Sequence, residues 1–303
     1  MNKRTVKVGS QTIEVERADK LLFPEDGISK GDLVDYYLKM AETILPHMKG
    51  RPVTMQRFPN GIAEEGFYQK EAPDYFPDWI QRVSIRVEGS GEEQDQIICD
   101  DAATLAYLAN QACITPHIWL SRADKLDYPD KLIFDLDPPN HNFQIVREAA
   151  FDLRAALEEV ELASYVMTTG SRGLHVVIPL DRSSEFDEVR EFARKMGDKL
   201  AARYPDRLTI AQRKADRGQR LFLDYTRNAY GQNSITPYAP RPLPGAPVAT
   251  PLEWSELANA DLDSQSYRMD NIFRRLAQKE DPWKDMRRHA QSLDKARQYL
   301  QQL

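Results

Sequence analysis

The chain has 303 residues, of which 41% are hydrophobic, 29% charged and 9% aromatic, and its formal net charge is −6 at pH 7. This composition excludes fibrous, disulfide-rich and intrinsically disordered proteins, and the length suffices for one large domain or two smaller ones. The negative charge excludes a protein that binds nucleic acid through a uniformly basic surface. A role on nucleic acid would therefore depend on local basic patches, such as the one between residues 203 and 220.

The first half of the chain has the pattern of short strands around two helices. The predicted elements are a hairpin over 6–16, a helix from Ser29 to Gly50, strands over 52–58, 83–87 and 96–99 with the turn GSGEE between the last two, and a buried helix over 102–114. Ser29 and Asp32 form the capping box that starts the first helix. His117 is then expected in the loop that follows the second helix.

The second half mixes strands and helices without strict alternation. The predicted elements are a strand over 131–137, a helix over about 143–160, strands over 164–169 and 174–180, a helix over 185–203, a strand over 220–225 and two helical stretches at the end. Residues 236–251 contain too many prolines for regular structure, and we expect them to run over the surface. The whole pattern predicts an α+β protein with a central, largely antiparallel sheet flanked by helices.

The remaining features of the sequence concern redox chemistry and membranes. Cys99 and Cys113 lie in no metal-binding or CxxC pattern, and we interpret them as small buried hydrophobic residues. The N-terminus has no apolar signal region, and the longest uncharged stretch, 102–121, contains polar residues that do not suit a membrane span. We expect a cytoplasmic protein without a membrane partner.

Two aspartates follow an apolar strand in the sequence KLIFDLDPP. Asp135 and Asp137 share one face of this strand, roughly 7 Å apart, while the alternate residues form an apolar face. Asp224 ends a second apolar strand, LFLD. Three carboxylates at neighbouring strand ends would suit two Mg²⁺ or Mn²⁺ ions about 4 Å apart, as in phosphoryl transfer. The alternative is a set of solvated strand-end carboxylates without metal.

A glycine-rich turn, TTGSRGLH, separates the next two strands. Its amides, the hydroxyl of Ser171 and the guanidinium of Arg172 could hold a polyphosphate, with Gly173 in the turn and His175 as a further donor. The turn is not a P-loop, because GxxxxGK[ST] is absent. The alternative is an ordinary hairpin with a histidine that is satisfied within the protein.

Four further residues are weak candidates when each is taken alone. His117 and Arg241 could add positive charge around a triphosphate. Phe67 and Tyr68, in the predicted loop EEGFYQK, could stack on nucleic-acid bases or could equally be core aromatics.

Taken together and in this order, these blocks resemble the polymerase domain of bacterial ligase D. That domain belongs to the archaeo-eukaryotic primase superfamily and serves non-homologous end joining. The resemblance runs from ADKLLFPEDGISKGDLVDYY (18–37) through GFYQK, HIWLS, LIFDLDPP, GSRGLH and LFLDY to YAPRP and beyond. It implies a single primase-polymerase domain over 1–303, with an N-terminal part (about 1–125) packed on a catalytic core (about 126–250) and C-terminal helices (about 251–303).

The resemblance also implies roles for individual residues. The implied sets are catalytic metal ligands at Asp135, Asp137 and Asp224; nucleotide ligands at Ser171, Arg172, Gly173, His175, His117 and Arg241; template-base stacking at Phe67 and Tyr68; and 5′-phosphate binding at Lys20 and Lys30. This sequence departs from the family pattern at Arg172, where many relatives have lysine, at Tyr68, where phenylalanine is usual, and at Arg17, where asparagine is frequent.

The implied activity is template-directed nucleotidyl transfer that prefers ribonucleotides and depends on two Mn²⁺ or Mg²⁺ ions. It would fill gaps and extend ends at 5′-phosphorylated DNA breaks, with NTP or dNTP as substrate and with Ku and a DNA ligase supplied in trans. The expected location is the cytoplasm, on the nucleoid at DNA breaks. The alternatives are a primase-polymerase of replication or damage tolerance and a catalytically inactive DNA-end-binding module. A haloacid-dehalogenase-type phosphatase is disfavoured because Pro138 and Pro139 follow the second aspartate.

Overall fold

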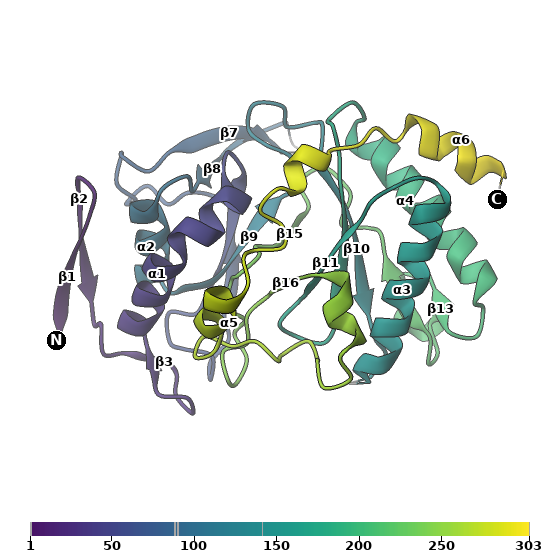
Figure 1. Cartoon of the computed structure of the whole chain (residues 1–303). Helices are drawn as coiled ribbons and strands as arrows, with labels where there is room; N and C mark the ends of the chain where they lie inside the picture. The colour runs from purple at the N-terminus through teal and green to yellow at the C-terminus, as the bar shows by residue number, and fades with distance from the viewer. Residues whose placement is uncertain (1, 88, 90, 141, 303) are drawn as a thin grey trace. The chain divides into compact units, whose positions relative to one another are not determined.

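The computed structural model describes residues 2–87, 89, 91–140 and 142–302 (Figure 1). The chain divides into two compact units. The first unit comprises Met1–Trp119, Asn233–Ala249 and Tyr267–Arg275. The second comprises Leu120–Gln232, Thr250–Ser266 and Leu276–Leu303. The chain thus passes between the units several times, and each unit is built from segments that are distant in sequence.

The second unit is built on a six-stranded sheet. In spatial order its strands are β13 (Leu208–Thr209), β14 (Leu221–Asp224), β10 (Lys131–Asp137), β12 (Leu174–Pro179), β11 (Tyr165–Thr168) and β16 (Pro251–Leu252). All neighbours pair antiparallel except β13 and β14, which are parallel. The expected largely antiparallel sheet is therefore confirmed, and its central strands β10 and β12 bear the DxD motif and His175.

Amphipathic helices pack on this sheet and fix the orientation of β10. Helices α3 (Phe143–Glu159) and α4 (Phe186–Arg203) lie along it (Figure 1) and bury apolar stripes that recur at helical spacing. In β10 itself Leu132, Phe134 and Leu136 are fully buried. Because side chains alternate along a strand, burial of this set assigns both aspartates to the opposite face.

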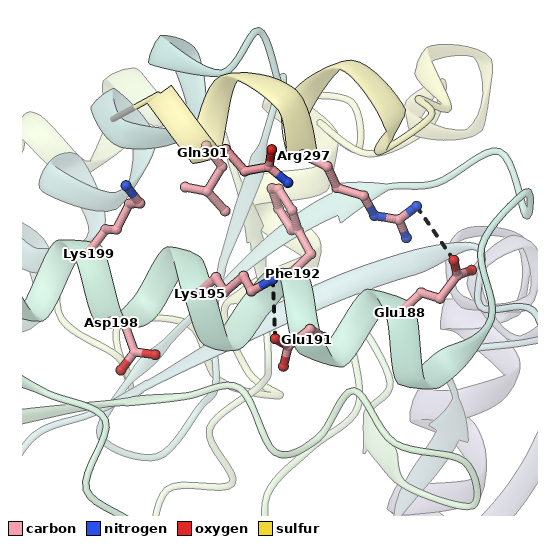
Figure 2. A pocket seen from close by; sticks show the side chains of 9 residues that line it. Glu188, Glu191, Phe192, Lys195, Asp198, Lys199, Arg297 and Gln301 are labelled. Atoms are coloured by element: carbon pink, nitrogen blue, oxygen red, sulfur yellow. Dashed lines mark ion pairs between the residues drawn. The ribbon is translucent and has the colours of Figure 1, made fainter.

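The C-terminal helix α6 (Asp294–Gln302) packs on α4 and leaves a hollow of about 570 Å³ between them (Figure 2). Phe192 and Leu300 are buried beneath this hollow. Arg297 pairs with Glu188 at 3.7 Å across the two helices. Apolar contact therefore holds the helix in place, since an ion pair this exposed contributes little.

The first unit contains a second, unforeseen sheet. Its strands in spatial order are β15 (Asn233–Ile235), β9 (Cys113–Trp119), β5 (Pro52–Arg57), β8 (Glu93–Ile98) and β7 (Arg82–Arg86), with β6 (Phe67–Gln69) also paired to β5. Around it lie the hairpin β1 (Lys3–Val8) and β2 (Gln11–Glu16), the pair β3 (Leu21–Phe23) and β4 (Ile28–Ser29), and the helices α1 (Lys30–Met48) and α2 (Ala102–Asn110). The predicted capping box is confirmed, because Ser29 and Asp32 bond each other's backbone amides at 2.8 and 3.2 Å.

The remaining elements are short. They are α5 (Ile272–Gln278) and three 3₁₀ turns, η1 (Lys214–Asp216), η2 (Trp254–Ala258) and η3 (Met286–His289). The predicted turn GSGEE joins β7 to β8, but its Ser90 lies outside the described residues. Cys99 and Cys113 are buried as expected, and burial raises the pKa of both thiols, that of Cys113 to about 12. Within the described ranges no helix has both the length and the apolar character of a membrane span.

The predicted helix over 102–114 is wrong in its last four residues. Helix α2 ends at Asn110, the chain turns at Ala112 with φ of 56°, and Cys113 to Trp119 form β9. All seven residues of β9 are buried, so the strand shows no alternation. A continuous apolar run of this kind is not distinguishable from a buried helix by periodicity. His117 consequently lies in a strand and not in a loop.

The proline-rich segment 236–251 is also not a surface segment. Most of it is buried, including Tyr238 and Val248, which are fully inaccessible. Its backbone groups are satisfied internally: the Tyr238 amide donates to the Ala249 carbonyl at 2.6 Å, and the Thr115 hydroxyl donates to the Pro240 carbonyl at 2.5 Å. Proline has no amide hydrogen to satisfy, so a proline-rich segment can be buried at low cost once its carbonyls find donors.

Candidate active site

Strand register brings the three predicted aspartates to adjacent positions in the second unit. Asp135 on β10 lies directly opposite Asp224 on β14 and, on its other side, opposite His175 on β12. Side chains at opposed positions of an antiparallel pair project to the same face. Asp137 projects to that face as well, two residues further along β10. The arrangement collects three carboxylates and an imidazole from three strands.

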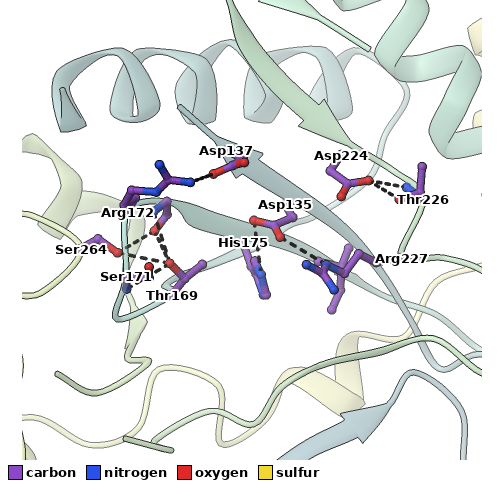
Figure 3. Close-up of polar contacts among 12 residues, drawn as sticks. Asp135, Asp137, Thr169, Ser171, Arg172, His175, Asp224, Thr226, Arg227 and Ser264 are labelled. Atoms are coloured by element: carbon purple, nitrogen blue, oxygen red, sulfur yellow. Dashed lines mark hydrogen bonds and ion pairs between the residues drawn. The ribbon is translucent and has the colours of Figure 1, made fainter. Parts of the chain in front are cut away.

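Asp135 is the best-partnered of these carboxylates (Figure 3). Its Oδ1 lies 3.5 Å from Nε2 of His175, and its Oδ2 accepts a hydrogen bond from Nε of Arg227 at 3.3 Å. Burial alone would raise the pKa of Asp135, but His175 and Arg227 outweigh it and lower the pKa to about 2. Asp135 is therefore held ionised.

The other two carboxylates have different surroundings. Arg172 donates to Oδ1 of Asp137 at 3.3 Å, and both side chains are more than a third exposed. Burial and the charges of Asp135 and Asp224 raise the pKa of Asp137, against the opposing effect of Arg172 and Arg217. Asp224 accepts hydrogen bonds from the amide and hydroxyl of Thr226. Three carboxylates thus lie among the positive charges of Arg172, Arg217 and Arg227.

This donor set suits a divalent cation of the Mg²⁺ or Mn²⁺ kind. In the described part of the chain no group of three or more acidic, histidine or cysteine side chains is already close enough to hold a metal ion. The carboxylates instead point to Arg172, Arg227 and Thr226. Hard oxygen ligands from several carboxylates are nevertheless what such ions prefer. The exposed Arg172–Asp137 pair is weak enough to be exchanged for a cation.

The glycine-rich turn beside these aspartates is held by buried hydroxyl groups (Figure 3). Thr169 Oγ1 accepts from the amides of Ser171 and Gly173 at 3.3 and 3.2 Å. From a distant segment, Ser264 Oγ donates to the Gly173 carbonyl at 2.9 Å, and Gln265 Nε2 donates to the Ser171 carbonyl at 2.9 Å. These contacts fix the backbone from which Ser171 and Arg172 project.

Several of these residues were not predicted from the sequence. Ser264 and Gln265 lie more than 90 residues from the turn, and nothing in their local sequence indicates contact with it. Arg227 could have been noticed, because a basic residue that closely follows the LFLD strand must lie near its terminal aspartate. The buried side chain of Asn228 bonds Ile133 and Tyr225, and so fixes the turn that carries Arg227.

The nucleotide-binding role expected for this turn predicts that Ser264→Ala weakens nucleotide binding. The KM for NTP should rise about threefold to tenfold with a smaller change in kcat, because one or two buried hydrogen bonds that fix the turn are lost. Single-turnover and steady-state incorporation assays separate the two parameters. Ser255→Ala, an exposed serine in the same unit, is the matched control. An unchanged KM would show that Ser264 does not position the turn for nucleotide binding.

The first unit presents the aromatic candidates. Phe67 and Tyr68 lie on the short strand β6, not in a loop as expected, because both pair with β5. Their exposed fractions of 46% and 59% exclude a core role. The Tyr68 ring lies edge-on to His117 at 5.5 Å, and His117 Nε2 is 3.5 Å from Gln56 Oε1.

The remaining predicted residues also belong to the first unit. Arg241 is half-buried in the proline-rich segment, where its amide donates to the Pro247 carbonyl at 2.7 Å. Lys20 donates to the side-chain oxygen of Asn60 at 2.9 Å. Burial lowers the pKa of Lys30, Glu16 opposes this, and the positive charges of Arg17 and Lys20 reinforce it. Three cationic residues therefore lie within electrostatic range of one another near the start of α1.

The predicted site residues are distributed over both units. The second unit holds Asp135, Asp137, Asp224, Ser171, Arg172, Gly173 and His175. The first unit holds His117, Arg241, Phe67, Tyr68, Lys20 and Lys30. The aspartates and the glycine-rich turn are brought together within one compact body.

Comparison with known proteins identifies the family of this site. Residues 29–283 match the family model described as the LigD primase-polymerase domain. The chain belongs to this family. It is 33% identical over 269 residues to the multifunctional non-homologous end joining protein LigD of Mycolicibacterium smegmatis, covering 88% of this chain and 35% of that protein. It is 31% identical over 275 residues to the bifunctional non-homologous end joining protein LigD of Bacillus subtilis, covering 90% and 44%.

A solved structure gives the same result for the fold. The polymerase domain from Mycobacterium tuberculosis ligase D, in complex with DNA, matches with a TM-score of 0.85 and 29% identity, covering 92% of this chain and 99% of that one. The primase-like fold expected from the sequence is therefore confirmed. The LigD primase-polymerase domain is a metal-dependent nucleotidyltransferase, which confirms the expected enzyme class and excludes the phosphatase alternative. The chain spans less than half the length of the two LigD relatives.

Proposed function

We propose that this chain extends DNA ends by template-directed nucleotidyl transfer during non-homologous end joining. One observation carries the proposal: three aspartates lie on neighbouring strands of one sheet. Beside them is the turn that bears Ser171 and Arg172, which a hydrogen bond from Ser264 holds in place. The LigD relatives are named for end joining, and the related polymerase domain is in complex with DNA, which supports DNA as the substrate. The proposed substrate at the site is an NTP or dNTP.

In this mechanism Asp135, Asp137 and Asp224 would hold Mg²⁺ or Mn²⁺, two ions in our proposal. When bound, such ions favour deprotonation of the primer 3′-hydroxyl and balance the charge of the leaving pyrophosphate. Asp135 contributes an ionised carboxylate whose position is fixed by His175 and Arg227. Thr226 orients the Asp224 carboxylate in the same way.

The glycine-rich turn would hold the triphosphate. Ser171 offers a hydroxyl donor and Arg172 a guanidinium, which can leave Asp137 for phosphate oxygens because their pair is exposed. His175 would donate to a phosphate oxygen or a ribose hydroxyl. Since phosphoryl transfer requires little covalent chemistry from the protein, positioning and charge compensation account for the rate.

The first unit carries further residues for which we propose roles in substrate binding. We propose that His117 and Arg241 bind nucleotide phosphates and that Phe67 and Tyr68 stack on the template base. The high exposure of both aromatic rings supports stacking, because a base needs an accessible π-face. We further propose that the chain prefers ribonucleotides and fills gaps. We also propose that it acts on the nucleoid at DNA breaks, together with Ku and a DNA ligase.

Lys20 and Lys30 would bind the 5′-phosphate of the strand downstream of the gap. We expect this phosphate to strengthen binding of gapped DNA about tenfold or more, and we expect Lys20→Gln with Lys30→Gln to abolish this preference. Equilibrium binding to two gapped duplexes, with a downstream 5′-phosphate or 5′-hydroxyl, measures the effect. Lys7→Gln, an exposed lysine on β1, should retain the preference.

The same substrates test the proposal against its alternatives. Metal-dependent addition of one templated ribonucleotide, stimulated by the downstream phosphate, is the result that we expect. Addition without phosphate dependence would favour a primase-polymerase of replication or damage tolerance. DNA-end binding without any addition would favour the inactive binding module.

A further inference from the structure

A second pocket, apart from the aspartate site, opens beside Lys30 in the first unit. It encloses about 460 Å³ and is lined by β2, the first residue of α1, the segment before β7 and the end of α2. The amides at the start of α1 are already bonded: those of Lys30 and Gly31 donate to the carbonyls of Lys20 and Ala18, each at 2.8 Å. The pocket is therefore defined by side chains and not by the helix terminus.

One wall of the pocket is aromatic. The rings of Trp79 and Tyr107 lie 5.9 Å apart and nearly perpendicular, and Tyr107 is held in turn by the buried ring of Phe76 at 5.0 Å. Trp79 and Tyr107 are only half-buried, although both belong to this packed cluster. A rigid and partly exposed aromatic surface is the usual platform on which a nucleic-acid base stacks.

The end of α2 adds two side-chain amides to the lining of the pocket, those of Asn110 and Gln111. The side-chain oxygen of Gln111 accepts from Arg57 at 3.2 Å and from Tyr75 at 3.4 Å, which leaves its amide nitrogen as a donor. Asn110 donates to the Glu14 carbonyl at 3.0 Å, while its own side-chain oxygen has no hydrogen-bond partner among the described residues. Buried acceptors without a partner are uncommon and call for a donor.

Charge decides how much of a nucleic-acid strand the pocket can accept. Lys30 supplies a cation at the pocket, and Arg17 and Lys20 lie close enough to influence it. Glu14 and Glu16 supply carboxylates on the same lining. Lys30 attracts one phosphate, whereas the phosphates of a continuous strand would also meet the two carboxylates, which repel them. The pocket accordingly favours a terminal nucleotide over a continuous strand.

We infer that this pocket receives the base of an unpaired 5′-terminal nucleotide whose phosphate is bound by Lys30. The inference rests on the proposed 5′-phosphate site and deepens it, because it adds recognition of a base to recognition of a phosphate. The chain would then distinguish a break whose downstream strand begins with one unpaired nucleotide from a break with a fully paired end.

The test uses four gapped duplexes whose downstream strand begins with one unpaired position. This position carries either an adenine or an abasic sugar, and either a 5′-phosphate or a 5′-hydroxyl. For the wild-type chain we expect adenine to strengthen binding about tenfold over the abasic sugar, as base–aromatic stacking does elsewhere, and to do so only with the phosphate present. Trp79→Ala should lose the contribution of the base and keep that of the phosphate. Lys30→Gln should lose both.

Controls separate stacking from damage to the fold. Trp79→Phe keeps an aromatic surface and should keep most of the effect of the base, with an unchanged Tm. Trp254→Ala, a half-buried tryptophan of the second unit, should bind all four duplexes as the wild type does. Equal binding of adenine and abasic ends by the wild type, with the phosphate preference intact, would overturn the pocket inference alone. Loss of the phosphate preference itself would overturn the proposed phosphate site.

Discussion

Asp137→Asn is expected to reduce nucleotide incorporation about a thousandfold or more while the protein remains folded. The substitution removes one of the three charged oxygen donors proposed to hold the catalytic cations, and preorganised charge supplies most of the rate in such reactions. Burial and the charges of Asp135 and Asp224 raise the pKa of Asp137, so the ionised carboxylate is not favoured by its surroundings. The Tm should therefore remain unchanged or rise slightly, as is common when a functional charge is removed.

Primer extension and thermal unfolding on the same samples test this expectation. Asp261→Asn, an exposed aspartate of the second unit, should retain the wild-type rate and is the matched control. Binding of gapped DNA should change little in Asp137→Asn, because the residues proposed to bind the 5′-phosphate belong to the first unit and do not include Asp137. A normal incorporation rate in this variant would show that the metal-ligand assignment is incorrect.

Gly173→Ala is expected to affect both the stability and the activity of the chain. A Cβ atom at this position would overlap the backbone carbonyl oxygen of Leu136, which lies between the two aspartates of β10. Backbone cannot move aside as a flexible side chain can, so the turn, the end of β10 or both must shift. We expect a loss of about 2 kcal/mol in unfolding free energy and about a hundredfold loss of activity.

Denaturant unfolding and single-nucleotide incorporation measure the two effects. Gly27→Ala is an informative control. Gly27 has φ of 68°, but apart from Gly27 itself and its two chain neighbours no atom of the described residues lies within 4 Å of the position that its Cβ would take. It should cost about 1 kcal/mol through backbone strain alone and leave activity unchanged. Wild-type stability and activity in Gly173→Ala would mean that the close approach to Leu136 does not constrain the site.

Local chemistry explains which features could be predicted from the sequence. The alternation of Asp135 and Asp137 with buried neighbours follows from strand geometry, and the capping box at Ser29 follows from the spacing of two residues. Strand β9 was not predictable, because burial on both faces removes the alternation that distinguishes a strand from a helix. The burial of residues 236–251 depends on donors such as Thr115, which are distant in sequence.

In the candidate site, too, some features follow from local sequence and others depend on contacts between distant segments. The acidic residues and the glycine-rich turn could be recognised individually, and their order along the chain led to the family. The register that sets Asp135 opposite both Asp224 and His175 is a tertiary property. The contacts of Ser264 and Gln265 with the turn link segments about 90 residues apart, so no local pattern encodes them.

The most direct test of template-directed nucleotidyl transfer is the addition of a single nucleotide to a primer across a one-base gap with a downstream 5′-phosphate, in the presence of Mn²⁺. The template base should be varied through all four identities. We expect the wild-type chain to add the complementary nucleotide in each case. We expect chelation of the metal to stop the addition, and we expect Asp137→Asn not to support it. If the folded wild-type chain, supplied with metal, adds no nucleotide, the proposed polymerase activity is contradicted.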